Sequence, residues 1–196
     1  VEVIEEAAFY NCKNIGNITL PQTLWKIEDM ALWGCEKIKK LELTSKISSV
    51  GSYVFRDCKA LEEIIVVPEN TYFKSVDGIL YEKKKYMRMM VCPAMKQGIV
   101  TVADGMHEIG TEAFHDCKYV TEVRLPESLE TINSSAFEGC SALEKIELPD
   151  NIEQIGMYAF KDCTALKSVK LPARLTDIDQ AVFAGCESLE NIVIPE

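Results

Sequence analysis

The sequence predicts a repeat solenoid, because several residue types recur along the 196-residue chain with one spacing. Successive cysteines are 23 residues apart in five of seven intervals. Seven cysteines are preceded at fixed distances by a small residue and an aromatic residue or leucine. A fixed period in the twenties is typical of a coil that stacks on itself. The cysteines are Cys12, Cys35, Cys58, Cys92, Cys117, Cys140, Cys163 and Cys186, and the prolines with the same step are Pro126, Pro149, Pro172 and Pro195.

Composition narrows the class of protein. Hydrophobic residues make up 47% of the chain, which is enough for a core. The net charge of -10 disfavours nucleic acid as a partner. Apolar runs are far shorter than the ~20 residues that a membrane-spanning helix needs. No phosphate-binding loop, catalytic signature or metal-ligand spacing occurs, so we predict neither an enzyme nor a cofactor or metal site.

The first part of each repeat predicts a short strand. In the repeat that begins at Leu143, the apolar side chains of Leu143, Ile146 and Leu148 face inward and polar residues separate them. Equivalent strands of successive repeats are expected to stack in parallel, ~4.8 Å apart. Pro149 ends the strand because proline has no N–H group to donate to the ladder.

The second part of the repeat predicts a return path. Gly156 stands where other repeats have glycine, asparagine or aspartate, which tolerate positive φ, so a tight bend is expected there. Residues 158–163 are too few for an independent helix, and we expect a helical or 3₁₀ turn that buries Phe160. Stacked cysteines would have parallel Cβ vectors, which suit a disulfide poorly, so we predict small buried side chains.

One segment interrupts the period. Phe55 and Phe114 are 59 residues apart, 13 more than two periods. Asp77-Gly78 begins an apolar run, residues 82–85 form a polar break, and a second apolar-rich run covers residues 86–92. Two extended runs around a polar break predict a β-hairpin inserted at about residues 69–96.

This repeat resembles the BspA-like leucine-rich repeat family over nearly the whole chain. The resemblance implies a right-handed leucine-rich-repeat coil with a parallel β-sheet on one face and short helical or 3₁₀ turns on the other. It also implies a bacterial surface or secreted protein, and some members are adhesins for host matrix proteins. Thr44 departs from the motif where other repeats have proline. The residues that carry the resemblance are Leu125-Pro126, Leu129, Ile132, Ala136-Phe137, Cys140, Leu143, Ile146 and Leu148-Pro149, and in the hairpin Asn70, Phe73, Asp77, Gly78, Leu80, Tyr81 and Pro93.

The period divides residues 1–196 as one domain. Both ends cut a repeat and neither has a polar cap, so we expect a fragment of a longer protein. Uncapped ends also predict end-to-end self-association. Partial copies occupy residues 1–14 and 189–196, and repeats occupy residues 15–37, 38–60, 61–96 with the hairpin, 97–119, 120–142, 143–165 and 166–188.

Exposed charges on the concave sheet face are the main candidate binding residues. Arg124, Glu147 and Lys170 hold one repeat position and alternate in sign, as do Glu122 and Lys145 at a neighbouring position. Two interpretations stay open. A parallel ladder avoids like charges at neighbouring positions, or the mixed charge forms a surface for a protein partner.

Three apolar residues interrupt this charged face. Ile65, Val67 and Ile99 predict an apolar spot beside the hairpin, which either covers it or leaves it as a binding spot. Our leading hypothesis is a non-enzymatic module of a surface or secreted protein that binds a protein or glycoprotein, such as a host matrix protein, through the sheet face. The alternative is a passive spacer that holds another domain away from the cell surface.

Overall fold

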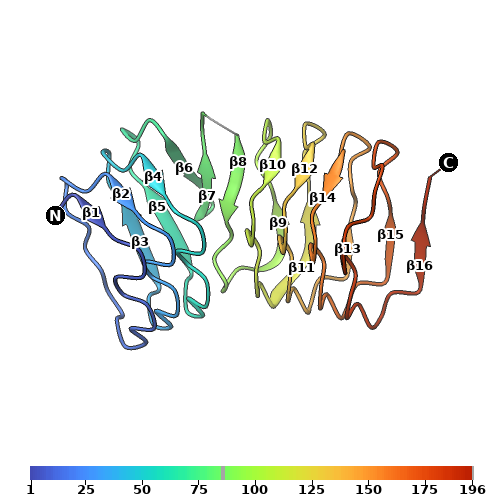
Figure 1. Ribbon diagram of the computed structural model, residues 1–196, viewed down its shortest axis with the longest axis horizontal. Helices are drawn as coiled ribbons and strands as arrows, with labels where there is room; N and C mark the ends of the chain where they lie inside the picture. Colours follow the sequence, from blue (N-terminus) through green and yellow to red (C-terminus); the bar gives the residue numbers. More distant parts are fainter. Residues whose placement is uncertain (85–86, 196) are drawn as a thin grey trace. The chain divides into compact units, whose positions relative to one another are not determined.

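The computed structural model describes residues 1–84 and 87–195, and these form two compact units (Figure 1). Unit 1 consists of Val1–Lys85 and Pro93–Met95, and unit 2 consists of Tyr86–Cys92 and Lys96–Glu196. Each unit is a stack of coils whose parallel strands pair from one coil to the next, which confirms the predicted solenoid. That residues 1–196 form one domain stays a prediction.

Unit 1 contains two parallel sheets and one antiparallel pair. The parallel sheets have the strand orders β1-β2-β4 and β3-β5, and β6 pairs antiparallel with β7. The strands are β1 (Val3–Ile4), β2 (Lys26–Ile27), β3 (Lys40–Leu43), β4 (Ser49–Val50), β5 (Glu63–Val66), β6 (Phe73–Val76) and β7 (Ile79–Glu82).

Unit 2 contains parallel strands throughout the part that the structure describes. They form the orders β14-β12-β10-β8, β13-β11-β9 and β15-β16. The strands are β8 (Arg88–Val91), β9 (Gln97–Thr101), β10 (Glu108–Ile109), β11 (Tyr119–Arg124), β12 (Thr131–Ile132), β13 (Lys145–Ile146), β14 (Gln154–Ile155), β15 (Ser168–Lys170) and β16 (Asn191–Val193).

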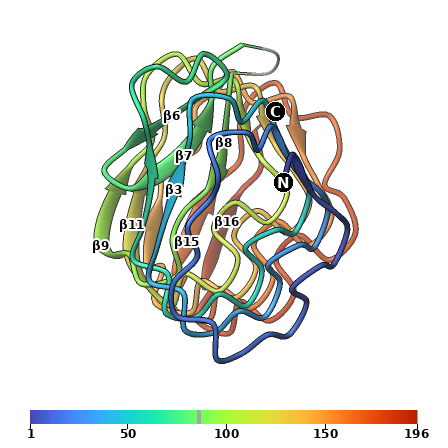
Figure 2. The ribbon, with the colours of Figure 1, turned by 90° about the vertical axis from the view of Figure 1, so that its left-hand side faces the viewer.

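Each coil contributes to two ladders of strands. The first ladder contains the predicted strands, and it places Glu122 opposite Lys145 in register. The second ladder contains two-residue strands of the return path, in which Ile109, Ile132 and Ile155 are neighbours and are buried. Return segments of successive coils run in the same direction, so their N–H and C=O groups meet in parallel register. The coils of unit 2 overlay in the view of Figure 2.

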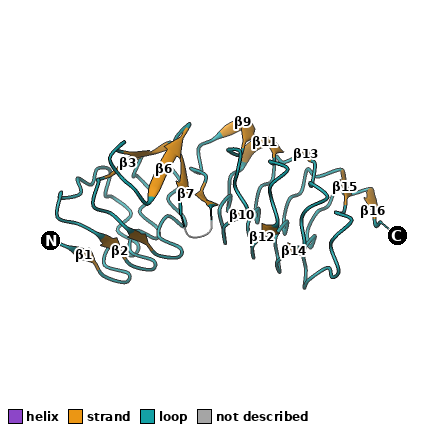
Figure 3. Ribbon diagram, turned by 90° about the horizontal axis from the view of Figure 1, so that it is seen from above, coloured by secondary structure: helices purple, strands orange, loops and turns teal. Residues whose placement is uncertain are grey.

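Turns, rather than helices, connect the ladders. Residues 1–84 and 87–195 contain no helix (Figure 3), and therefore no helix that is long and apolar enough to cross a membrane. The expected helical or 3₁₀ turn is a series of overlapping β-turns, in which the Lys161 N–H donates to the Tyr158 carbonyl at 3.0 Å and the Cys163 N–H donates to the Phe160 carbonyl at 3.2 Å. Tyr158 and Asp162 lie within this series and have φ of 60° and 58°. These left-handed residues prevent the series from continuing as a helix.

The glycines of the return path have a different role from the expected one. Gly156 is not among the residues with positive φ, which falls two places later on Tyr158. A Cβ atom on Gly156 would lie 2.7 Å from the backbone nitrogen of Ser134. Glycine is therefore needed because the preceding coil passes close by, and the prediction of a bend at this residue was wrong.

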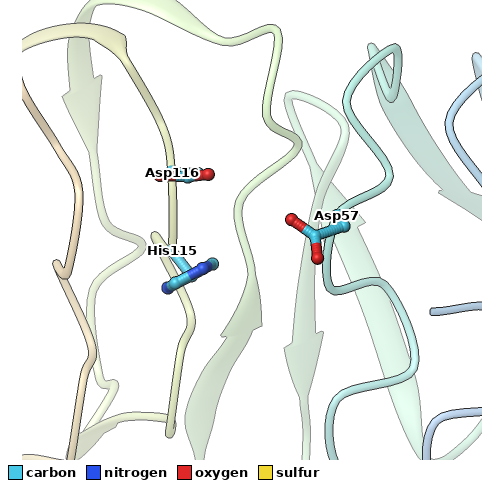
Figure 4. Close-up of side chains that lie close together, drawn as sticks. All are labelled: Asp57, His115 and Asp116. Atoms are coloured by element: carbon cyan, nitrogen blue, oxygen red, sulfur yellow. The ribbon is translucent and has the colours of Figure 1, made fainter. Parts of the chain in front are cut away.

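Side chain and glycine alternate from coil to coil at the residue before the cysteine. Gly139 has a φ of 77°, and a Cβ atom on it would meet the side chain of Asp116 in the preceding coil. Figure 4 shows Asp116 of unit 2 and Asp57 of unit 1, which hold this repeat position in their own units. The observed pairs are Asn11 with Gly34, Asp116 with Gly139 and Asp162 with Gly185.

Stacked aromatic rings fill the core of unit 2. The ring centroids of Phe114 and Phe137 are 4.7 Å apart, and those of Phe137 and Phe160 are 5.0 Å apart. All three side chains are fully buried, which confirms the core position predicted for Phe160. The one-period spacing places each ring against the equivalent ring of the next coil.

The inserted segment contains a β-hairpin that turns at Asp77-Gly78. Strands β6 and β7 pair antiparallel, and Asp77 and Gly78 form the two-residue connection. Their φ values of 50° and 71° are both positive, as the tight hairpin turn that favours Asp-Gly requires. The turn predicted at residues 82–85 includes residue 85, which lies outside the described residues, and it stays a prediction. In the second predicted run, Arg88–Val91 form β8, which pairs parallel with β10.

The cysteine thiols make hydrogen bonds between coils. Six cysteines are buried, as predicted, whereas Cys12 is exposed and Cys186 is half-buried. The Cys140 thiol donates to the Phe114 carbonyl at 3.0 Å, and the Cys163 thiol donates to the Phe137 carbonyl at 3.1 Å. Each of these carbonyls also accepts a backbone N–H group. A small apolar residue in place of the cysteine would have no donor for the second hydrogen bond to the carbonyl.

A thiol reagent is expected to separate these environments. At pH 8, 5,5′-dithiobis(2-nitrobenzoate) should label Cys12 rapidly in the native chain, because its side chain is exposed. Cys186 should react more slowly, because burial raises its pKa to about 12 and the thiolate is the reactive form. All eight cysteines should react in denaturant. The Cys12→Ser variant should lose the fast phase, and a second fast thiol in the native chain would contradict this assignment.

Candidate functional site

An open hollow lies on the first-ladder face of unit 2, and we call it the sheet-face hollow. Its volume is about 440 Å³. It is lined by residues of β11, β13 and β15 and of the turns that follow β11 and β13. The lining residues are Glu122, Val123, Arg124, Leu125, Glu127, Lys145, Glu147, Leu148, Pro149, Asp150 and Lys170.

Strand alternation positions the charged side chains. Val123 and Ile146 are register partners whose side chains are buried. The residues on either side of them therefore point out of the sheet, which places Glu122 and Lys145 on the hollow. All five predicted charged residues line the hollow, so the structure brings Glu122, Arg124, Lys145, Glu147 and Lys170 together.

The charges on the sheet-face hollow pair along each strand. Arg124 Nε donates to Glu122 Oε1 at 2.8 Å, and Lys145 Nζ lies 2.9 Å from Glu147 Oε1. The hydrogen bond from Arg124 lowers the pKa of Glu122, and the hydrogen bond to Glu147 raises the pKa of Lys145. Each partner therefore favours the charged form of the other, and opposite charges alternate along both strands.

The alternating charges form ion pairs between neighbouring strands in unit 1 and along a single strand in unit 2. In unit 1, Lys40 of β3 forms an ion pair with Glu63 of the neighbouring strand β5. In unit 2, opposite charges meet within β11 and just beyond the two residues of β13. Exposed ion pairs contribute little to stability because water screens them, so these pairs organise the surface more than they stabilise the fold.

The strand pairing is interrupted beside the sheet-face hollow. The structure shows β13 paired with β11, and β15 paired with β16. In residues 1–84 and 87–195, no backbone hydrogen bond joins β13 to β15. Lys170 of β15 instead reaches Asp150, which follows Pro149, with an Nζ to Oδ1 distance of 3.4 Å.

Two lining acids were missed by the sequence-based prediction. Glu127 and Asp150 each directly follow a strand-ending proline, Pro126 and Pro149. The prediction considered only the alternating strand positions, and these acids come after the strand. A charged residue directly after the repeat proline is the signal that marks them.

The predicted apolar residues fall in different units. Ile65 is exposed and Val67 is half-buried in unit 1. Ile99 belongs to unit 2, is 53% exposed and lies opposite Glu122 in the register of β9 and β11. Ile99 thus extends the row of Glu122 and Lys145 with an apolar side chain. One apolar spot formed by all three residues stays a prediction.

Comparison with protein-family models identifies the repeat. The family model for the BspA type leucine rich repeat region matches residues 1–77 and 92–196 in six copies. The chain belongs to the BspA-type leucine-rich repeat family. None of the curated proteins matches it significantly.

Solved structures of bacterial leucine-rich repeat proteins are similar to this BspA-type chain. A leucine rich cell surface protein from Faecalibacterium prausnitzii A2-165 is 25% identical with a TM-score of 0.78, and the match covers 98% of this chain and 57% of that one. The pneumococcal vaccine antigen PcpA is 23% identical with a TM-score of 0.83, covering 98% and 54%. A leucine-rich repeat protein from Eubacterium ventriosum ATCC 27560 is 21% identical with a TM-score of 0.67, covering 99% and 70%. The chain spans little more than half the length of the first two proteins.

Proposed function

We propose that this chain is a non-enzymatic module of a bacterial surface or secreted protein and that it binds a protein or glycoprotein partner at the sheet-face hollow. The observation that carries the proposal is the fixed charge pattern of Glu122, Arg124, Lys145 and Glu147 on short parallel strands. Stacked repeats commonly present such surfaces to partners. The similar protein from Faecalibacterium prausnitzii, which is named as a cell surface protein, supports the location.

Charge placement on the hollow suits recognition of a protein surface. Each sign is held at a defined place by its neighbour, so a partner with complementary charges fits in one orientation. Ile99 adds an exposed apolar side chain next to Glu122. A mixed polar and apolar surface of this kind is typical of protein interfaces that form and separate.

A charge swap tests the proposal without changing the net charge. The double variant Glu122→Arg with Arg124→Glu keeps an ion pair on β11 and reverses its direction. Its binding to immobilised collagen, laminin and fibronectin, measured by surface plasmon resonance, is expected to fall at least tenfold for each ligand that the unchanged chain binds. The loss follows because like charges then face each other across the interface.

A matched control separates this effect from general damage. Lys39 and Glu62 form an exposed ion pair in unit 1, with Nζ and Oε1 3.2 Å apart. Lys39→Glu with Glu62→Lys should leave binding unchanged, because neither residue lines the hollow. Equal binding by both swaps would refute the hollow as the interface. No binding to any of the three matrix proteins by the unchanged chain would favour the passive spacer.

A further inference from the structure

In unit 2 the second ladder stops at β14, although the chain continues into an equivalent segment. Residues 174–179 follow residues 151–156 by one period. In the preceding coils, the Asn133 N–H donates to the Ile109 carbonyl at 3.0 Å, and the Gly156 N–H donates to the Ile132 carbonyl at 2.8 Å. Within the described residues, no backbone hydrogen bond joins 174–179 to β14. The outer edge of β14 is therefore open.

The opening leaves the neighbouring turns in place. The Tyr158 N–H donates to the Gln180 carbonyl at 3.1 Å, and the Phe160 N–H donates to the Val182 carbonyl at 2.9 Å. The rings of Phe160 and Phe183 stack with centroids 5.4 Å apart. The two coils are thus held together at their turns while their return segments lie apart.

A groove of about 1080 Å³ occupies this opening, and we call it the β14 groove. It is lined by residues of β12, β14 and the segment 174–180. The side chain of Ile178 is 49% exposed, whereas Ile155 and Ile132 at the same repeat position are 4% and 0% exposed. Ile178 therefore offers an apolar side chain to the groove.

The backbone of Ile155 faces the β14 groove. The N–H groups of Gln154 and Gly156 donate to carbonyls of the preceding coil. Successive residues of a strand direct their backbone groups to opposite sides, so the N–H and C=O of Ile155 point away from β12. Such an open edge pairs with an extended segment of another chain by adding it as a strand.

Charge on the groove walls selects the kind of segment. Glu153, Asp177 and Asp179 line the groove together with a single base, Arg174. Arg174 lies near Glu153, with a distance of 3.6 Å between Nη1 and Oε1. Two exposed aspartates on the opposite wall therefore favour a ligand with basic side chains.

We propose that the β14 groove binds an extended basic peptide segment, which adds as a strand to the edge of β14. An apolar side chain of the peptide packs against Ile178, and basic side chains next to it meet Asp177 and Asp179. This site shares no lining residue with the sheet-face hollow, so the two proposals stand or fall separately.

The probe is the peptide acetyl-Lys-Val-Lys-Val-Lys-amide, titrated into the ¹⁵N-labelled chain. The largest amide shift changes are expected at Ile155, Gly156 and Ile178. N-methylation of the central lysine and its two valine neighbours removes backbone donors and should weaken binding at least tenfold, because strand addition depends on main-chain hydrogen bonds. Replacing the three lysines by glutamates should abolish the shift changes.

Two double variants test the charge. Asp177→Lys with Asp179→Lys should weaken binding of the probe at least tenfold. Asp104→Lys with Glu144→Lys makes the same change in net charge at exposed residues that do not line the groove, and it should change binding less than twofold. Equal weakening by both variants would indicate only general attraction of a basic peptide and would overturn the site.

Hydrogen exchange of the free chain gives an independent check. The Ile155 amide is expected to exchange at least tenfold faster than the Gly156 amide, because only Gly156 has a backbone partner. Equal protection of the two amides would show that segment 174–179 closes on β14 in solution, and it would overturn the proposal. Tight binding of the N-methylated peptide would also overturn the proposal, because that peptide lacks the backbone donors needed for strand addition.

Discussion

Replacing Asn70 by aspartate (Asn70→Asp) is expected to destabilise the chain more than any other substitution proposed for it. Asn70 Nδ2 donates to the carbonyls of Thr44 and Ile47 at 2.8 Å each. Its Oδ1 accepts the N–H groups of Tyr72 and Phe73 at 2.9 and 2.8 Å. The side chain is 1% exposed, so water cannot replace these partners.

Aspartate keeps the shape of Asn70 and removes both donors. The Thr44 and Ile47 carbonyls then face a carboxylate, and the free energy of unfolding should fall by about 3–5 kcal/mol, since each buried group without its partner costs ~1–3 kcal/mol. Chemical denaturation followed by circular dichroism measures the loss. Hydrogen exchange in β6 and β7 should increase most, because Asn70 fixes the start of the hairpin.

Asn151→Asp is the matched control for this substitution. Asn151 Nδ2 donates to one carbonyl, that of Glu127, at 2.8 Å in an exposed setting. Its change to aspartate should cost less than about 1 kcal/mol, because solvent compensates for the lost bond. Equal losses at Asn70 and Asn151 would show that burial does not strengthen the Asn70 contacts.

The deficit of Asn70→Asp should shrink as the pH falls. A buried carboxyl between two carbonyl oxygens has a raised pKa in the folded state, whereas the unfolded chain keeps about 3.9. Between these two values the folded state binds more protons, so lowering the pH stabilises it relative to the unfolded state. The difference from the unchanged chain, measured between pH 7 and pH 4, is the test.

The second large effect is expected for Gly156→Ala. An added Cβ atom would lie 2.7 Å from the Ser134 nitrogen and 3.0 Å from the Asn133 carbonyl carbon. These are backbone atoms that cannot rotate away, so the coils must move apart. Overpacking of this kind costs about 1–3 kcal/mol. Denaturation midpoints should fall accordingly, and exchange should increase at the Ile132 and Gly156 amides.

Gly16→Ala provides the comparison. The nearest atom to a Cβ on Gly16 is the Lys37 carbonyl oxygen at 3.9 Å, an ordinary contact. Neither glycine has positive φ, so backbone strain does not distinguish them. Gly16→Ala should be neutral or stabilise by ~0.4–1 kcal/mol, because alanine restricts the unfolded chain. A loss at Gly16 as large as that at Gly156 would contradict the role of coil contact.

The 23-residue period correctly predicted for several residues whether they are buried or exposed. The repeat placed Phe160, Leu143 and Ile146 in the core and placed Glu122 and Lys145 side by side on the surface, and the structure agrees. Side-chain periodicity reports which way each residue faces, so these predictions needed no knowledge of neighbouring coils. The hairpin turn at Asp77-Gly78 was missed, although Asp-Gly is a hairpin signal in the sequence.

The repeat pattern could not predict the contacts between neighbouring coils. Gly156 carries a glycine because Ser134 lies close to it, and Gly139 carries one beside Asp116. The direction of the Arg124 pair along its strand and the open edge of β14 also depend on distances between backbones. One repeat contains no record of how closely the next repeat approaches.

The sequence by itself determined a coil with a 23-residue period, its buried faces and its column of cysteines. Tertiary structure alone decided that the cysteine thiols bond to carbonyls of the preceding coil and that Glu122 pairs with Arg124. It also decided where successive coils separate, at the sheet-face hollow and at the β14 groove. The physical reason is that burial follows from the pattern within one coil, whereas hydrogen bonds, ion pairs and openings depend on the distance between two.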